Sequence, residues 1–190
     1  MNIGEIFLLL LRGFGNNVLI TVLATFLPLV LGVVLTILAG KLRYVGRIAE
    51  WLSLPFECIT PIILIVCVCF TTPDVFATLG FGNALREIFN SAWFIGIALS
   101  VAFVGYMPAR YNPSASILKN CLCNGIGLIC TAFQWSFSVG FVGTLDMLKA
   151  AMIVGGELYN YWVVVPIFLV SAVLLGVPQI AKRLCSQFLK

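Results

Sequence analysis

The chain has 190 residues, of which 62% are hydrophobic and 9% are charged, and its net charge is +4. Soluble domains are about half apolar and about a quarter charged, so a soluble fold of this length has no means of burying so much apolar surface. The composition excludes an ordinary soluble domain and predicts a protein whose solvent is largely lipid. We expect one domain, residues 1–190, built as an all-α polytopic membrane helix bundle.

The sequence lacks the residues and motifs that several kinds of catalysis and ligand binding require. There is no His, which is the commonest general base and metal ligand, and the 7 carboxylates are dispersed. Neither a phosphate-binding Walker loop nor a serine nucleophile elbow is present. The 7 cysteines lie mostly inside apolar runs, where packing is the expected role. We therefore expect no enzyme activity, no cofactor, no metal and no nucleic-acid partner.

The first predicted elements are an interfacial segment and a membrane span. Residues 1–17 combine the acidic Glu5 with an apolar run that is too short to cross a bilayer, so they are expected to lie at the interface. They do not have the basic start of a signal peptide. The first span is predicted at 18–39, between a polar stretch at 15–17 and a basic loop at 41–47.

The second span is predicted at 52–70. Residues 49–56 are expected to form an interfacial bend that places Trp51 at headgroup depth. Glu57 and Thr60 interrupt this run. A carboxylate inside a membrane is costly and so indicates a functional role, while a position at the interface near the helix end is the alternative for Glu57. The Pro- and Gly-rich residues at 71–90 are typical of a loop.

The third span is predicted at 91–107. Ala92, Gly96 and Ser100 repeat at four-residue spacing, and such a stripe of small residues lets another helix approach closely. Packing is therefore the expected role of the stripe. A short basic turn at 108–116 follows.

The fourth span is predicted at 117–133, and a polar stretch follows it at Gln134, Trp135 and Ser136. These residues are polar enough to line a cavity or to break a helix, because polar groups in a membrane bundle tend to face its interior. A plain helix end at the outer interface is the alternative.

A short amphipathic helix at 144–153 and a fifth span at 161–180 complete the chain, and Lys182 and Arg183 follow the fifth span. Five crossings with the N-terminus outside place eight basic residues inside and three outside. The eight are Lys41, Arg43, Arg47, Arg110, Lys119, Lys182, Arg183 and Lys190, and the three are Arg12, Arg86 and Lys149. Because cytoplasmic loops carry an excess of Lys and Arg, the N-terminus is predicted outside and the C-terminus inside the plasma (cytoplasmic or inner) membrane.

Three stretches are similar to features of one transporter family. GNNVLIT at 15–21 resembles the family's opening glycine-to-threonine stretch, and FECITP at 56–61 resembles its arginine-x-threonine-proline, with Cys58 in place of the arginine. In the third, QWSF at 134–137 resembles a lysine-aspartate-threonine-serine-leucine stretch, and TLDMLKAA at 144–151 resembles the alanine-rich helix after it. The chain thereby resembles the permease subunits of binding-protein-dependent ABC importers, of the polar amino acid type.

The resemblance implies five core helices and import of an amino acid or a similar small polar solute by alternating access. It implies ATPase subunits, a second permease chain and a solute-binding protein as partners. The solute is expected to cross between two permease chains, with Gln134, Trp135 and Ser136 near its path and with Glu57 and Thr60 as further candidates.

One departure concerns the loop that docks on the ATPase in the family, of which only the six residues 111–116 remain. Six residues are too few to form a docking helix and return to the membrane. Arg110, Tyr111 and Asn112 are the candidates for facing a cytoplasmic partner. Either a second permease supplies the docking, or the chain no longer couples to ATP hydrolysis and has an accessory or assembly role. A membrane substrate-binding subunit or a channel-like protein is a further alternative.

Overall fold

The computed structural model describes residues 2–42, 44–48, 51, 88, 91–137, 139, 145–158, 162 and 164–188. Of these residues 87% are helical and none is in a strand, which confirms the all-α class for this part of the chain. The predicted span at 52–70, with Glu57 and Thr60, lies outside the described residues, and so does the loop predicted at 71–90 apart from Ile88.

The longest element is α1 (Ile3–Lys41), an unbroken helix of 39 residues. It begins at a capping box in which the Glu5 backbone N–H donates to Asn2 Oδ1 and the Asn2 N–H donates to Glu5 Oε2, each at 2.8 Å. The predicted interfacial segment at 1–17 and the predicted span at 18–39 are therefore continuous within one helix, and their placement relative to a membrane stays a prediction. The Asn2 cap starts the helix at Ile3, the third residue of the chain. The polar stretch at 15–17 is part of the same helix.

The helices after α1 are α6 (Ala92–Phe103), α7 (Tyr106–Ala109), α8 (Ile117–Ser136), α9 (Met147–Glu157) and α10 (Val164–Phe188). The predicted helices at 91–107 and 117–133 are confirmed, the former with a turn at 104–105 and the latter with an extension to Ser136. The start predicted at 144 was early, because Asp146 caps α9. Lys182 and Arg183 lie inside α10 and not after it, since both are good helix formers and cations are favourable near a helix C-terminus.

Within the described residues, two helical stretches are long and apolar enough to cross a membrane by length and composition. One is α1, and the other is the α6–α7 stretch from Ala92 to Ala109.

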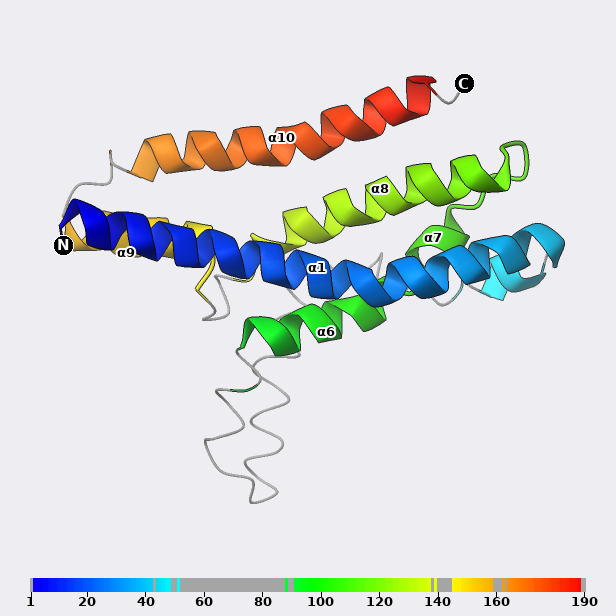
Figure 1. Cartoon of the computed structure of the whole chain (residues 1–190), viewed down its shortest axis with the longest axis horizontal. Helices are drawn as coiled ribbons and strands as arrows, with labels where there is room; N and C mark the ends of the chain where they lie inside the picture. Colours follow the sequence, from blue (N-terminus) through cyan, green and yellow to red (C-terminus); the bar gives the residue numbers. More distant parts are fainter. Residues whose placement is uncertain are drawn as a thin grey trace, which may run out of the picture.

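The helices are arranged lengthwise along α1 (Figure 1). α6 and α8 pack beside its middle and C-terminal parts, α9 packs beside its N-terminal part, and α10 contacts α8 and α9. α1, α6 and α10 run in one direction while α8 runs in the other (Figure 1). The end of α1, the turn between α7 and α8, and the end of α10 consequently gather at one end of the bundle, with α9 and the start of α1 at the other.

The core forms where α6, α7 and α8 meet α1, around Ile20, Ala24, Ile95, Leu99, Met107 and Leu128. The small-residue stripe of α6 lies in this contact, since Ala92, Gly96 and Ser100 are all buried. A Cβ built on Gly96 would lie 2.6 Å from Leu23 Cβ of α1, closer than real Cβ atoms approach. The packing role predicted for the stripe is therefore confirmed.

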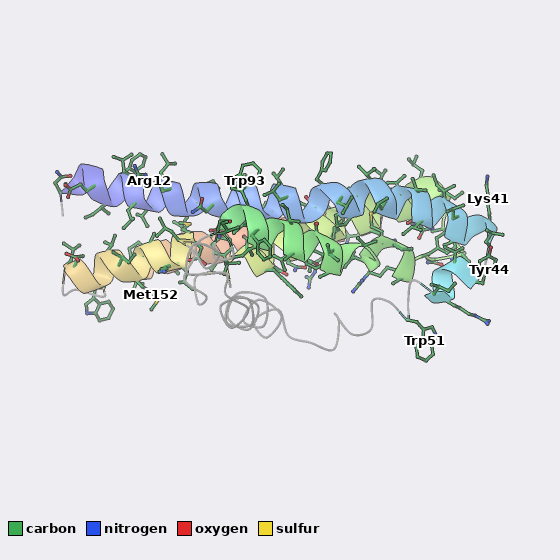
Figure 2. The ribbon with its side chains drawn as sticks, turned by 90° about the horizontal axis from the view of Figure 1, so that it is seen from below. Arg12, Lys41, Tyr44, Trp51, Trp93 and Met152 are labelled. Carbon is green, nitrogen blue, oxygen red and sulfur yellow. The ribbon has the colours of Figure 1, made fainter. Side chains whose placement is uncertain are left out.

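Large apolar side chains also cover the outside of the bundle (Figure 2). On α1, Phe7 and Phe26 are 65% and 69% exposed, and on α6 Trp93 is 60% exposed. Apolar side chains of α8 and α10 are exposed as well, Leu118 and Val173 among them. Water-soluble monomers rarely leave such extensive apolar faces open, so these faces have the chemistry of a surface that contacts lipid.

Replacing Gly96 by Ala tests the close approach of α6 to α1. The added methyl group forces the two helices apart, and Gly96→Ala is expected to lower the free energy of unfolding by about 1–3 kcal/mol. The matched control is Gly15→Ala, because a Cβ at Gly15 meets nothing within 4 Å. Thermal unfolding in detergent measures both, and an equal Tm for the two variants would contradict this packing.

Candidate functional site

A polar junction joins α1 to the start of α9. The side chain of Asn16 donates from Nδ2 to the Leu145 carbonyl at 2.7 Å, and the Met147 backbone N–H donates to Asn17 Oδ1 at 3.2 Å. The first backbone N–H groups of a helix have no partner within the helix, so an outside acceptor is needed there. Asn17 supplies that acceptor to α9 from α1. We call this set, with Asp146 and Gly13, the α1–α9 junction.

Asp146 caps α9 within the junction. Its carboxylate Oδ1 accepts from the Lys149 N–H at 2.7 Å, and the residue is fully buried. Gly13 lets the backbone of Asp146 approach, because a Cβ on Gly13 would lie 2.6 Å from the Asp146 carbonyl oxygen. The glycine, the two asparagines and the aspartate therefore form one fitted contact between segments that are distant in the chain.

Asn17 is fully buried, and its amide orientation is fixed because Oδ1 faces the Met147 N–H. Its Nδ2 has no hydrogen-bond partner among the described residues. The Asn17 carbonyl accepts from Thr21 Oγ1 at 2.7 Å, and the Thr21 carbonyl accepts from Thr25 Oγ1 at 2.8 Å. Among the described residues, the interior of α1 thus offers two open donors for an oxygen acceptor, Asn17 Nδ2 and Thr36 Oγ1, while the Thr21 and Thr25 hydroxyls are satisfied by their own helix.

At the other end of the bundle, Arg110 packs on the ring of Tyr106. The guanidinium carbon lies 3.8 Å from the ring centroid, and Nη1 donates to the Tyr106 carbonyl at 3.3 Å. The Tyr106 hydroxyl in turn lies 3.2 Å from Thr131 Oγ1 of α8. These contacts hold α7 against α8 and direct the exposed Arg110 to the end of the bundle.

The turn between α7 and α8 is closed by asparagines. The Asn112 N–H donates to Asn120 Oδ1 at 2.8 Å, and Asn120 Nδ2 donates back to the Asn112 carbonyl at 2.9 Å. Asn124 Nδ2 adds a bond to the Arg110 carbonyl at 3.1 Å.

Tyr111 is half-buried, and a Cβ on Gly40 of α1 would lie 3.1 Å from its hydroxyl. Residues 111–116 contain no helix, as predicted, and the turn is held against α1 and α8.

The predicted partner-facing residues are therefore close together but unlike in exposure. Arg110 and Asn112 are exposed, whereas Tyr111 packs inward toward Gly40. Their role toward a partner stays a prediction.

The predicted substrate-path residues lie at the C-terminal end of α8. Trp135 packs its ring edge-on to Phe103 of α6, with the ring centroids 5.0 Å apart. Ser136 is fully buried and donates to the Phe133 carbonyl at 2.7 Å, and Gln134 is half-buried. α8 ends at Ser136, as the helix-end alternative requires, while a role in a solute path stays a prediction.

The α1–α9 junction was not predicted from the sequence. Asn16 and Asn17 were noted as a polar stretch, and Asp146 as part of a short helix, without any link between them. An Asp directly before an apolar helix is a cap signal, and Asn inside a long apolar helix indicates a partner across the bundle. Which partner it is depends on the tertiary fold, because Asn17 and Met147 are 130 residues apart.

Comparisons of the chain with protein-family models, with curated proteins and with solved structures give no match.

Replacing Asn17 by Ala tests the junction. The Met147 N–H then loses its acceptor inside the protein, and an unsatisfied buried group costs about 1–3 kcal/mol. We expect faster hydrogen exchange of the backbone amides at 147–151 in Asn17→Ala. Asn16→Ala is the matched control with a smaller expected effect, because Asn16 is only half-buried. Unchanged exchange at 147–151 in Asn17→Ala would show that the junction does not hold α9.

Proposed function

We propose that this chain is a transmembrane subunit of an ABC-type importer for an amino acid or a similar small polar solute. The observation that carries the proposal is the α1–α9 junction. Two stretches that resemble the permease family, at 15–21 and 144–151, are in contact through Asn16 with Leu145 and Asn17 with Met147. Because these two stretches are in contact in the fold, they support kinship with the permease family more strongly than two similar stretches that lie apart would.

The proposed placement is a five-span bundle in the plasma membrane, with its N-terminus outside. The apolar outer faces and the two long apolar stretches support membrane insertion. The charge distribution supports the orientation. The end of α1 with the helical turn after it, the α7–α8 turn with the start of α8, and the end of α10 share one end of the bundle (Figure 1), and these segments contain Lys41, Arg47, Arg110, Lys119 and Arg183. The acidic side chains among the described residues, Glu5, Asp146 and Glu157, lie toward the other end.

In this proposal the ATPase subunits bind the cationic end and drive alternating access. A solute-binding protein delivers the solute to the opposite end, and a second permease chain completes the pathway. Arg110 and Asn112 are exposed where the ATPase would dock. The buried amide of Asn17 is a polar point of α1 near the proposed solute-entry end.

The α7–α8 turn favours a second candidate function, an accessory or assembly role for a permease-like chain that has lost its coupling. The asparagine bonds that close this turn leave no docking helix at 111–116. A chain of this kind would hold a partner membrane protein in place without itself moving solute.

Topology is tested with fusions and tags on the full chain. A C-terminal green fluorescent protein is expected to fluoresce, and a C-terminal alkaline phosphatase to be inactive, because the cationic end faces the cytoplasm. An epitope tag placed before the first residue is expected to be accessible to antibody on intact spheroplasts. Finding both termini on one side of the membrane would contradict the five-span arrangement and favour a protein with an even number of spans.

The transport role is tested by purification of the tagged chain from its host's membranes in mild detergent. An ATP-binding subunit and a second permease chain are expected to co-purify. Arg110→Ala is expected to lower recovery of the ATP-binding subunit about five- to tenfold, the loss typical of a central interfacial Arg. Arg12→Ala is the matched control, since Arg12 is exposed toward the opposite end (Figure 2).

A chain that purifies alone would contradict the importer proposal. Solute uptake that is unchanged after gene deletion, together with loss of one other membrane protein, would identify the accessory role instead.

A further inference from the structure

The chain turns where α1 ends, and we call Leu42, the helical turn at 44–48 and Trp51 together the elbow. The Leu42 N–H donates to the Leu38 carbonyl at 2.7 Å, and the Val45 N–H donates to the Leu42 carbonyl at 3.0 Å. One helical turn follows at 44–48. A Cβ on Gly46 would lie 3.8 Å from Ala39 Cβ, so the elbow lies back against the last turns of α1.

The elbow presents two aromatic residues and an isoleucine to its surroundings. Tyr44, Ile48 and Trp51 are 59%, 54% and 74% exposed. Tyr44 and Ile48 are four residues apart within the helical turn at 44–48, so they lie on one side of it. Figure 2 shows Tyr44 and Trp51 at the end of the molecule that also carries Lys41. Tyr and Trp favour the boundary between headgroups and acyl chains, because their rings are apolar and their tips are polar.

Cations accompany this apolar side. Lys41 and Arg47 are exposed on either side of Tyr44 in the chain. Long basic side chains lay their stems along apolar surface and extend their charged heads outward. In the sequence, residues 41–51 carry three cations and one carboxylate, and the described acidic residues belong to segments toward the opposite end of the bundle, so the net charge of this segment is positive.

The elbow also continues an apolar face of α1. Val34, Ile37 and Leu38 are 51%, 36% and 38% exposed in the turns just before it. A lipid-facing helix therefore leads directly into an aromatic and cationic segment at its end. Aromatic rings and cations together at the end of an apolar helix are the groups favoured at the boundary of a leaflet with negatively charged headgroups.

We propose that the elbow binds the headgroups of anionic phospholipids. Tyr44, Ile48 and Trp51 enter the boundary between headgroups and acyl chains, and Lys41 and Arg47 contact the phosphates. The inference rests on the proposed membrane placement and adds a lipid preference to it. Charge complementarity selects lipid with net negative charge over zwitterionic lipid, since the latter offers no net charge to the two cations.

The test uses full-length protein in nanodiscs of mixed phosphatidylcholine and phosphatidylglycerol. Bromine, which quenches Trp fluorescence on contact, is placed on one lipid or on the other while the overall composition stays the same. The contribution of Trp51 is the difference between the unaltered protein and Trp51→Phe. Brominated phosphatidylglycerol is expected to quench Trp51 more strongly than brominated phosphatidylcholine, and added salt to reduce the difference.

Charge-removing variants identify the groups responsible. Lys41→Gln and Arg47→Gln are each expected to lower the preference for phosphatidylglycerol at Trp51 by up to about fivefold. Arg12→Gln removes an exposed cation from the same helix toward its other end and is expected to leave the preference unchanged.

Three results would overturn the proposal. Equal quenching by both lipids would show that the elbow contacts lipid without selecting charge, and would leave the membrane placement standing. Absence of quenching by either lipid, with the protein retained in the discs, would place the elbow against protein or water. Failure of the protein to enter the discs would overturn the membrane placement itself.

Discussion

Most of the buried polar side chains among the described residues bond to partners inside the protein, because the core around them is apolar. The threonine hydroxyls of Thr21 and Thr25 bond to the carbonyls of their own helix. Asparagines serve the backbone where helices begin or turn, Asn17 at the start of α9 and Asn120 at the α7–α8 turn. An unpaired backbone group in such surroundings is costly, so these few side chains decide where helices begin and which segments lie together.

Close approach along α1 complements this polar pairing. Three glycines of the bundle bring a neighbouring segment near the helix: Gly13 meets Asp146, Gly32 meets Met107, and Gly96 of α6 meets Leu23. The three contacts lie at different positions along α1, so α9, α7 and α6 each pack closely against a different part of this helix. Lipid gives apolar helices little reason to associate, and small residues allow the dense packing that holds them together.

Much of the helical order could be predicted from the sequence. The runs at 91–107 and 117–133 are apolar and bounded by turn residues, and the spacing of Ala92, Gly96 and Ser100 predicted their packing. The undivided α1 could not be predicted in the same way. Its polar stretch stays helical where α9 supplies partners for Asn16 and Asn17, a contact that local sequence does not encode.

In the candidate site, too, some features follow from the local sequence and others depend on the tertiary fold. The exposed Arg110 and Asn112 follow from a short polar turn after an apolar run, which is local information. The inward packing of Trp135 on Phe103 and the α1–α9 junction depend on segments that are distant in the chain. Pairings of that kind become visible only when the tertiary fold is known.

The length of α1 has a consequence for its depth in a bilayer. At about 1.5 Å per residue the helix is about 58 Å long, roughly twice the thickness of a hydrocarbon core. Arg12 and Lys41 are about 43 Å apart along it, close to the full thickness of a bilayer with its headgroups. In the proposed membrane placement these two cations would lie at opposite water boundaries, so the turns before Arg12 would extend beyond the hydrocarbon core into the outer interface beside α9, and the two charges on one helix would set the depth of the whole bundle.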